Sequence, residues 1–137
     1  IALDYFKGIN DKYGHPEGDR LLAELSLLCM ENIRDFDVFG RLGGEEFAIL
    51  MPNTDLDAAY QVSERLRSIV ASTLIPINGR EVMVTFSLGV AVLHDEQDTL
   101  SALFRRADQA LYAAKHSGRN RVAVWEEQLE SGEEKQD

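Results

Sequence analysis

The chain has 137 residues, 45% of them hydrophobic, and a formal net charge of -10 at pH 7. That length suits one domain with a substantial hydrophobic core. The acidic balance argues against binding long nucleic acid, because that function needs a basic surface to displace counterions. A small nucleotide held through a metal ion remains compatible with it.

The chain carries few signs of secretion or membrane insertion. Its one cysteine, Cys29, cannot form a disulfide within the chain, which favours a reducing, cytoplasmic compartment. No apolar run approaches the roughly 18 residues that span a membrane, and no signal peptide is visible. The sequence opens on the strand-like Ile1 without an initiator Met, so we expect a piece of a longer protein. The cytoplasmic part of a membrane-bound protein is one form that such a piece takes.

The first third of the chain predicts a strand, a loop and a helix. Residues 1–6 form an apolar run typical of a core strand, and residues 10–18 are dense in the Gly, Pro, Asn and Asp of a loop. Apolar side chains at spacings of three and four then predict a helix over residues 19–33 with one buried face.

A pair of glycines marks the next feature. Gly43 and Gly44 separate two β-type runs and predict a tight hairpin, because only Gly takes positive φ without steric cost. The simplest interpretation is a solvated hairpin tip. The alternative is a site where Glu45 and Glu46 meet a cation or a phosphate. Adjacent side chains on an extended segment point to opposite faces, so at most one of these carboxylates faces a given site.

The second half predicts, in order, a helix, a hairpin leading into a long strand, another helix and a final strand, over residues 56–70, 77–92, 100–118 and 121–125. Asn53 or Thr54 is the expected cap of the first helix and Thr99 of the second. The long strand is expected to bend or thin at Gly89. Helices between mostly non-sequential strands indicate an α+β or α/β sandwich around one central sheet. Beyond the predicted domain, residues 1–125, the acidic tail over 126–137 is expected to be disordered.

Polar residues that stand outside this pattern form a cluster near the first loop. Asn10 and Asp19 together can read a guanine edge, since an amide and a carboxylate offer the matching donors and acceptors. Lys7 is a point charge suited to a phosphate. Ordinary turn polarity explains the same residues, His15 included.

A basic cluster stands near the end of the chain, just past the last predicted helix. Lys115, Arg119 and Arg121 surround Ser117-Gly118. Such residues either satisfy the C-terminus of the helix or reach a triphosphate.

Taken together, the sequence resembles the diguanylate cyclase (GGDEF) domain family. The segments that carry the resemblance are Asp4–Asp11, Tyr13-Gly14-His15, Gly18-Asp19, Arg41–Phe47, Phe86–Gly89 and Ala107–Lys115. They cover nearly all of residues 1–125 in order and with matching spacing, which is far more specific than Gly-Gly-Glu-Glu-Phe alone. The helix and loop with which the family opens have no counterpart here.

The resemblance implies a nucleotidyl-cyclase fold related to polymerase palms, with a central antiparallel sheet flanked by helices. It implies a transferase of bacterial second-messenger signalling that condenses two GTP molecules into cyclic di-GMP and releases pyrophosphate. It further implies Mg²⁺ or Mn²⁺ as cofactor, a homodimer whose two GTP sites face each other, and a sensory or regulatory domain upstream.

Residue roles follow from the same resemblance. Asn10 and Asp19 would bind guanine with His15 nearby, and Lys7, Lys115 and Arg119 would meet the phosphates. Glu45 would hold the metal together with the Leu3 carbonyl and act as base for the 3′-hydroxyl. Asp4 and Glu46 complete the expected metal ligands.

One position departs from the family. The first metal-binding aspartate of the family falls on Ala2, which has no ligand atom in its side chain. Asp4 lies on the same face of the strand, roughly 7 Å further along. We therefore expect impaired metal binding and turnover. The alternative function is a catalytically silent receptor for cyclic di-GMP or GTP.

A regulatory site is also implied. Arg34 and Asp37 stand where the family has its RxxD product-inhibition site, and Arg65 is a plausible partner from another surface. Arg34 can grip a phosphate or a guanine edge with two hydrogen bonds. An exposed ion pair of little energetic value is the alternative.

Overall fold

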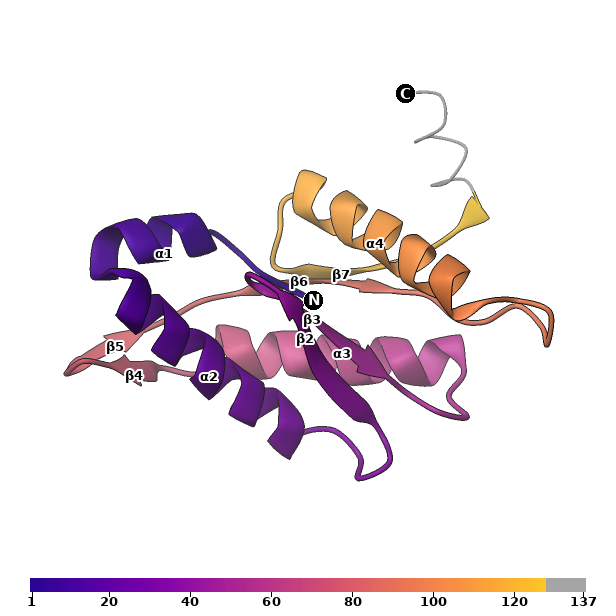
Figure 1. Cartoon of the computed structure of the whole chain (residues 1–137), viewed down its shortest axis with the longest axis horizontal. Coiled ribbons are helices and arrows are strands. Elements are labelled where there is room, and N and C mark those ends of the chain that lie inside the picture. Colours follow the sequence, from indigo (N-terminus) through magenta and orange to yellow (C-terminus); the bar gives the residue numbers. More distant parts are fainter. Residues whose placement is uncertain (128–137) are drawn as a thin grey trace.

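The structure, a computed structural model, describes residues 1–127 (Figure 1). Its elements in chain order are β1 (Ala2–Leu3), α1 (Phe6–Tyr13), α2 (His15–Glu31), β2 (Val38–Gly43), β3 (Glu46–Leu50), α3 (Leu56–Ala71), β4 (Ile75–Ile77), β5 (Arg80–Val82), β6 (Phe86–Val90), α4 (Leu100–His116) and β7 (Arg121–Val124). Most of the tail predicted over residues 126–137 lies outside the described residues, and the prediction of its disorder stays untested.

The central sheet is five-stranded, in the order β2-β3-β1-β6-β7, and β4 with β5 forms a separate hairpin. The β1 strand pairs antiparallel with β3 on one side and β6 on the other. Three of the four pairings in this sheet are antiparallel, as expected, and the fourth, between β6 and β7, is parallel, so the sheet is mixed. The α4 helix connects these two strands, as a parallel crossover requires. The α+β class is confirmed.

The loop predicted over residues 10–18 is mostly helical. The α1 helix ends at Tyr13, α2 begins at His15, and Gly14 between them has a φ of 92°. Pro16 lies in the first turn of α2, where its missing N–H costs nothing and its fixed φ suits the helix. Gly14 therefore separates two consecutive helices and Pro16 lies at the start of the second, with no longer loop between them. The strand expected over residues 1–6 is limited to β1, because α1 already begins at Phe6.

The helix caps are partly as predicted. Thr99 caps α4 by accepting a hydrogen bond of 3.0 Å from the Ala102 N–H. Asp55, rather than Asn53 or Thr54, caps α3 through the Ala58 N–H at 2.8 Å. Thr54 is engaged elsewhere, with Arg34.

Two predictions about the hairpin and the long strand also changed. Asn78 and Gly79 form the expected turn with φ values of 50° and 79°. The strand beyond it divides into β5 and β6, and Gly89 lies inside regular β6 pairing. A Cβ on Gly89 would collide with the α4 backbone at Ala107 and Leu111. Gly89 therefore allows α4 to approach β6 closely and does not bend the strand.

The core lies between the sheet and its helices. It includes Leu21 and Leu25 of α2, Leu66 of α3 and Phe86 of β6, all at most 1% exposed. The α4 helix packs on β6 and β7, and α3 contacts the same two strands. Figure 1 shows α1 and α2 together at one end of the molecule, next to the β4–β5 hairpin. Among residues 1–127, no helix has both the length and the apolarity for a membrane crossing.

A largely apolar cavity of about 360 Å³ lies between the sheet and two of its helices. Its walls come from β3, β6, α3 and α4. The Ile1 ammonium stands at its edge and donates to the Phe47 carbonyl at 2.9 Å, and burial lowers the pKa of this group from 8.0 to about 6. Among residues 1–127, no strand lies between the parts of β3 and β6 that extend beyond Ile1.

Candidate functional site

The Gly43-Gly44 hairpin joins β2 to β3 and is closed by an unusual turn. Gly43 and Gly44 have φ values of 150° and 50°, and the strand register shifts between Arg41 and Gly43. The Arg41 guanidinium donates two hydrogen bonds, of 3.0 and 2.7 Å, to the Gly44 carbonyl. These two hydrogen bonds hold the turn closed. Glu45, the next residue, is half-buried. The predicted tight hairpin is confirmed.

The two carboxylates of the hairpin have different surroundings. The Leu3 N–H donates to the backbone carbonyl of Glu45 at 3.2 Å, which places Glu45 beside the end of β1. Glu46 lies 3.7 Å from the Lys115 ammonium at the end of α4. Lys115 is thereby brought to the hairpin, as a shared phosphate site would require.

Ala2 occupies the centre of this part of the sheet. It is fully buried, opposite Glu46 on β3 and Ser87 on β6. Within residues 1–127, no group of three or more His, Cys, Asp and Glu side chains is arranged to hold a metal ion. Mg²⁺ is commonly bound by one or two carboxylates together with substrate phosphates. The residues present therefore fit a magnesium ion only weakly, through Glu45 and bound phosphate oxygens.

Asp4 is only 4% exposed, and its carboxylate is occupied by hydrogen bonds. The hydroxyls of Thr85 and Ser87 each donate to it at 2.6 Å, and the Asn120 N–H donates at 3.0 Å. These donors come from the segment that leads into β6, from β6 itself and from the turn before β7. The metal-ligand role expected of Asp4 stays a prediction, and it would compete with all three contacts.

The predicted guanine-binding residues lie where α1 meets α2. The side-chain oxygen of Asn10 is buried and accepts no hydrogen bond among the described residues. It lies against Gly18, where a Cβ would collide with it. Asp19 follows Gly18 on the exposed side of α2, and His15 is exposed at the start of the same helix. A buried polar atom without a hydrogen-bond partner is uncommon in native proteins, which makes this oxygen a candidate for contact with a polar ligand.

The remaining predicted phosphate contacts come from α1 and from the turn after α4. Lys7 is exposed in the first turn of α1. The Arg119 guanidinium lies 4.9 Å from the centre of the Tyr5 ring. Tyr5 is the residue immediately before α1, so Lys7 and Arg119 are drawn toward the same end of the molecule as Lys115 and Glu45.

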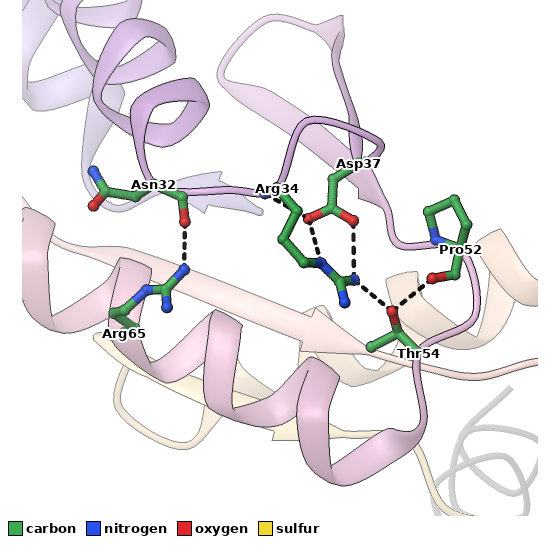
Figure 2. A network of polar contacts seen from close by, with 6 residues as sticks. All are labelled: Asn32, Arg34, Asp37, Pro52, Thr54 and Arg65. Carbon is green, nitrogen blue, oxygen red and sulfur yellow. Dashed lines mark hydrogen bonds and ion pairs between the residues drawn. The ribbon is translucent and has the colours of Figure 1, made fainter.

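Two of the predicted regulatory residues, Arg34 and Asp37, lie apart from this site, in the turn between α2 and β2 (Figure 2). Arg34 donates to both oxygens of Asp37, at 3.1 and 3.0 Å. The Asp37 side chain has no exposed surface, whereas that of Arg34 is 37% exposed. Burial tends to raise the pKa of Asp37, and the hydrogen bonds and charge of Arg34 outweigh it, so the pKa lies below its usual 3.8.

Two further contacts extend this network. Arg34 also donates to the Thr54 hydroxyl at 2.5 Å, and Thr54 donates to the Pro52 carbonyl at 2.9 Å. Arg65, on α3, reaches the same turn and donates to the Asn32 carbonyl at 2.5 Å. The structure therefore brings Arg34, Asp37 and Arg65 to one region, although Arg34 and Arg65 bind different partners.

Sequence reasoning missed several residues of these sites. Thr54 was expected only as a helix cap, and Tyr5, Thr85 and Asn120 were given no role. Asn120 had a readable signal, because Asn after Gly-Arg suits a left-handed turn. Thr85 had none, since its partner Asp4 lies 81 residues away.

The family model described as "Diguanylate cyclase, GGDEF domain" matches residues 1–121. The response regulator PleD of Caulobacter vibrioides is 45% identical over 124 residues, which are 89% of this chain and 27% of that protein. The uncharacterized protein YhcK of Bacillus subtilis is 48% identical over 127 residues, covering 92% of this chain and 35% of that protein. The chain thus spans only about a third or less of the length of these relatives.

Solved structures agree with this likeness. The active GGEEF domain of a diguanylate cyclase from Vibrio cholerae superposes with a TM-score of 0.84 at 38% identity, covering 91% of this chain and 79% of that one. The GGDEF domain of DgcB from Caulobacter crescentus, in complex with c-di-GMP, gives a TM-score of 0.83 at 31% identity, covering 90% of this chain and 73% of that one. The chain belongs to the diguanylate cyclase GGDEF domain family.

Proposed function

We propose that this domain binds GTP at the end of the molecule where α1, the Gly43-Gly44 hairpin and the C-terminus of α4 meet, and condenses two GTP molecules into cyclic di-GMP. The observation that carries the proposal is the buried, unpaired oxygen of Asn10 beside Gly18. We assign this oxygen to guanine as an acceptor; Gly18 leaves it the space that it occupies, because a Cβ there would collide with it.

Guanine recognition is assigned to Asn10 and Asp19. The Asn10 amide can pair with one part of the guanine edge, and the Asp19 carboxylate can accept from the N1–H and 2-amino donors. An exposed carboxylate such as Asp19 gains most when it meets two donors at once. His15 lies at the rim of the same site.

Phosphate binding is assigned to Lys7, Lys115 and Arg119. Lys115 now pairs with Glu46 across 3.7 Å, which is long for an ion pair and easily exchanged for a phosphate. Arg119 offers a planar fork suited to phosphate oxygens.

In the proposed reaction, two copies of the domain face each other, each holding one GTP. The 3′-oxygen of one GTP attacks the α-phosphorus of the other, a new P–O bond forms, and the bond to pyrophosphate breaks. Glu45 accepts the proton of the hydroxyl. The 3′-oxygen of the second GTP then attacks the α-phosphorus of the first in the same way and closes the ring, so that one cyclic di-GMP and two pyrophosphates result. The protein contributes mostly positioning and charge stabilisation.

A divalent metal, Mg²⁺ or Mn²⁺, would be held by Glu45, the Leu3 carbonyl and the phosphates. When bound it supplies charge neutralisation on the leaving pyrophosphate. Because Ala2 offers no second carboxylate, we propose weak metal affinity and slow turnover for this sequence. Glu46 is a weaker candidate ligand, because it pairs with Lys115 and adjacent side chains on an extended segment point to opposite faces.

We further propose that cyclic di-GMP inhibits the domain by binding Arg34, Asp37 and Arg65. The DgcB structure contains c-di-GMP bound to a domain of the same family. Arg34 would keep Asp37 ionised and turn its exposed edge to a phosphate or guanine of the product.

A second function, binding without turnover, is favoured by one observation. Ala2 is fully buried in the centre of the sheet and its methyl side chain has no ligand atom, so this position offers no second carboxylate to a metal. Under this alternative the domain is a receptor for cyclic di-GMP or GTP.

The setting of the domain is also a proposal. The match to PleD, a response regulator of which it covers 27%, supports a catalytic unit governed by a regulatory domain in a longer cytoplasmic protein. The predicted domain limits, residues 1–125, remain part of this proposal, with the family match extending over residues 1–121.

One incubation separates the two functions. The protein is mixed with GTP and Mg²⁺, and pyrophosphate release and cyclic di-GMP are both quantified; binding of added cyclic di-GMP is measured on the same sample. Turnover supports the cyclase, and binding without turnover supports the receptor. If the sample shows no turnover and no binding, both functions are contradicted.

A further inference from the structure

The turn between α4 and β7 has an unusual backbone. Gly118, Arg119 and Asn120 have φ values of 128°, 62° and 46°, so three successive residues lie in the left-handed region. Gly takes this conformation freely and Asn tolerates it, but Arg does so at an energetic cost. Such a run persists only where surrounding contacts hold it.

Asn120 is held from two sides. Its backbone N–H donates to the Asp4 carboxylate at 3.0 Å. Its side-chain oxygen accepts from the Arg67 guanidinium of α3 at 2.9 Å. Arg67 is itself fixed by Glu64, one turn earlier on the same helix. Asn120 is thus anchored to β1 through its backbone and to α3 through its side chain.

The neighbouring residues form a second contact. Tyr5 follows Asp4 and Arg119 precedes Asn120, and the Arg119 guanidinium lies 4.9 Å from the centre of the Tyr5 ring. Two consecutive residues at the end of β1 therefore hold two consecutive residues of the turn. Tyr5 is 68% exposed and Arg119 is half-buried, so this contact lies at the surface.

Asp4 is suited to this structural task because its carboxylate is buried and hydrogen-bonded on both oxygens. The Thr85 hydroxyl and the Asn120 N–H share one oxygen, and the Ser87 hydroxyl takes the other. Charge-assisted bonds of this kind are short and strong.

We propose that Asp4 and Asn120 are positioning residues for nucleotide binding, which fix the α4–β7 turn so that Arg119, lying on Tyr5, meets the phosphates of GTP. The proposal rests on the proposed function, which assigns Arg119 to the phosphates. It gives Asp4 a role through the turn, and Asn120 a role that the sequence pattern left unassigned.

The test uses Asn120→Ala, which removes the acceptor for Arg67 and disfavours positive φ. Asn78→Ala is the matched control, because Asn78 also has a positive φ of 50° but lies in the β4–β5 turn. GTP and guanosine affinities are measured in EDTA, where no turnover occurs, and the Arg119 Nε–H signal is followed by NMR. Asp4→Asn is a second variant. Asn120→Gly, which keeps positive φ and loses only the Arg67 contact, replaces Asn120→Ala if that variant does not fold.

We expect Asn120→Ala and Asp4→Asn to weaken GTP binding about tenfold, since a displaced Arg loses charge-assisted phosphate contacts, and to leave guanosine binding within about twofold. The Arg119 Nε–H signal should lose its ring-current shift in both. Asn78→Ala should change neither. Unchanged GTP affinity in Asn120→Ala, or equal losses for GTP and guanosine, would overturn the proposal.

Arg119→Ala separates this proposal from the one on which it rests. If Arg119→Ala weakens GTP binding and Asn120→Ala does not, the positioning role is wrong and the phosphate assignment stands. If Arg119→Ala leaves GTP affinity unchanged, the phosphate assignment of Arg119 fails and the positioning role falls with it.

Discussion

Arg34 and Asp37 form a fork in which the guanidinium donates to both carboxylate oxygens while the Asp37 side chain has no exposed surface. The pair is therefore more than an exposed ion pair of little value, which was the alternative interpretation of its sequence pattern. It closes the turn between α2 and β2, and Thr54 connects it to the start of α3.

Replacing Arg34 by Ala should raise the pKa of Asp37, because burial then acts without the opposing side-chain hydrogen bonds and charge of Arg34 and only the hydrogen bond from the backbone N–H of residue 34 remains. NMR titration of the Asp37 carboxyl carbon measures this. In the unchanged chain the pKa of folded Asp37 lies below its unfolded value, so Asp37 stabilises the fold fully above about pH 4 and less as the pH falls through its folded pKa. The acid sensitivity below pH 4 should therefore shrink in Arg34→Ala.

The same variant should lower the free energy of unfolding at pH 7 by about 1–3 kcal/mol, because Asp37 is left without its charged partner. Arg20→Ala is the control, since Arg20 is 66% exposed in a 3.6 Å pair with Glu17 and should change stability by less than about 0.5 kcal/mol. Equal effects of the two substitutions would contradict the buried fork. Cyclic di-GMP binding should be lost only in Arg34→Ala.

Gly18→Ala should abolish guanosine binding, because the new Cβ collides with the Asn10 side-chain oxygen and displaces it. It should also destabilise the fold by about 1–3 kcal/mol through overpacking. Gly8→Ala is the matched control in the neighbouring helix, where a Cβ meets nothing within 4 Å. Gly8→Ala should stabilise α1 by about 0.5–1 kcal/mol and leave guanosine affinity unchanged. Isothermal calorimetry and thermal unfolding provide both numbers.

An extension of three apolar β-branched residues before Ile1 should raise the stability of the chain by at least about 2 kcal/mol. The pairing of Ala2 with Glu46 and Ser87 fixes the register, so the added residues would run between β3 and β6 into the 360 Å³ cavity. They would also replace the buried Ile1 ammonium by a peptide bond. Three added Gly-Ser residues serve as control; stabilisation by these as well would show that filling the cavity is not the cause.

The fold was largely predictable because its helices and hairpins carry local signals. Thr99 at the start of α4 and Asn78-Gly79 in the β4–β5 turn are short-range features that a pattern captures. The α1–α2 junction was not predictable in the same way, since Gly14 and Pro16 indicate a loop as readily as a helix break. The packing of α4 on Gly89 depends on a helix that follows the strand and cannot be read from the strand.

The residues of the candidate sites were also predictable only where their signals are local. Glu45, Asn10 and the Arg34–Asp37 pair were predicted as site residues because each stands within a short, recognisable motif. Asp4 was expected as a metal ligand, yet its contacts with Thr85 and Asn120 span 81 and 116 residues and appear only when the chain is folded. Contacts over such separations leave no local pattern.

The most direct test of the central claim compares cyclic di-GMP formation from GTP and Mg²⁺ by the unchanged chain, Ala2→Asp and Glu45→Gln. We expect the unchanged chain to make cyclic di-GMP slowly, with two pyrophosphates released per product. Ala2→Asp should be at least about tenfold faster, and Glu45→Gln should make no cyclic di-GMP. Before GTP is added, Ala2→Asp should be less stable than the parent by about 2 kcal/mol and should regain stability with Mg²⁺, because a buried carboxylate needs a partner. Folded Ala2→Asp protein that binds GTP and Mg²⁺ and still makes no more cyclic di-GMP than the parent would contradict the account.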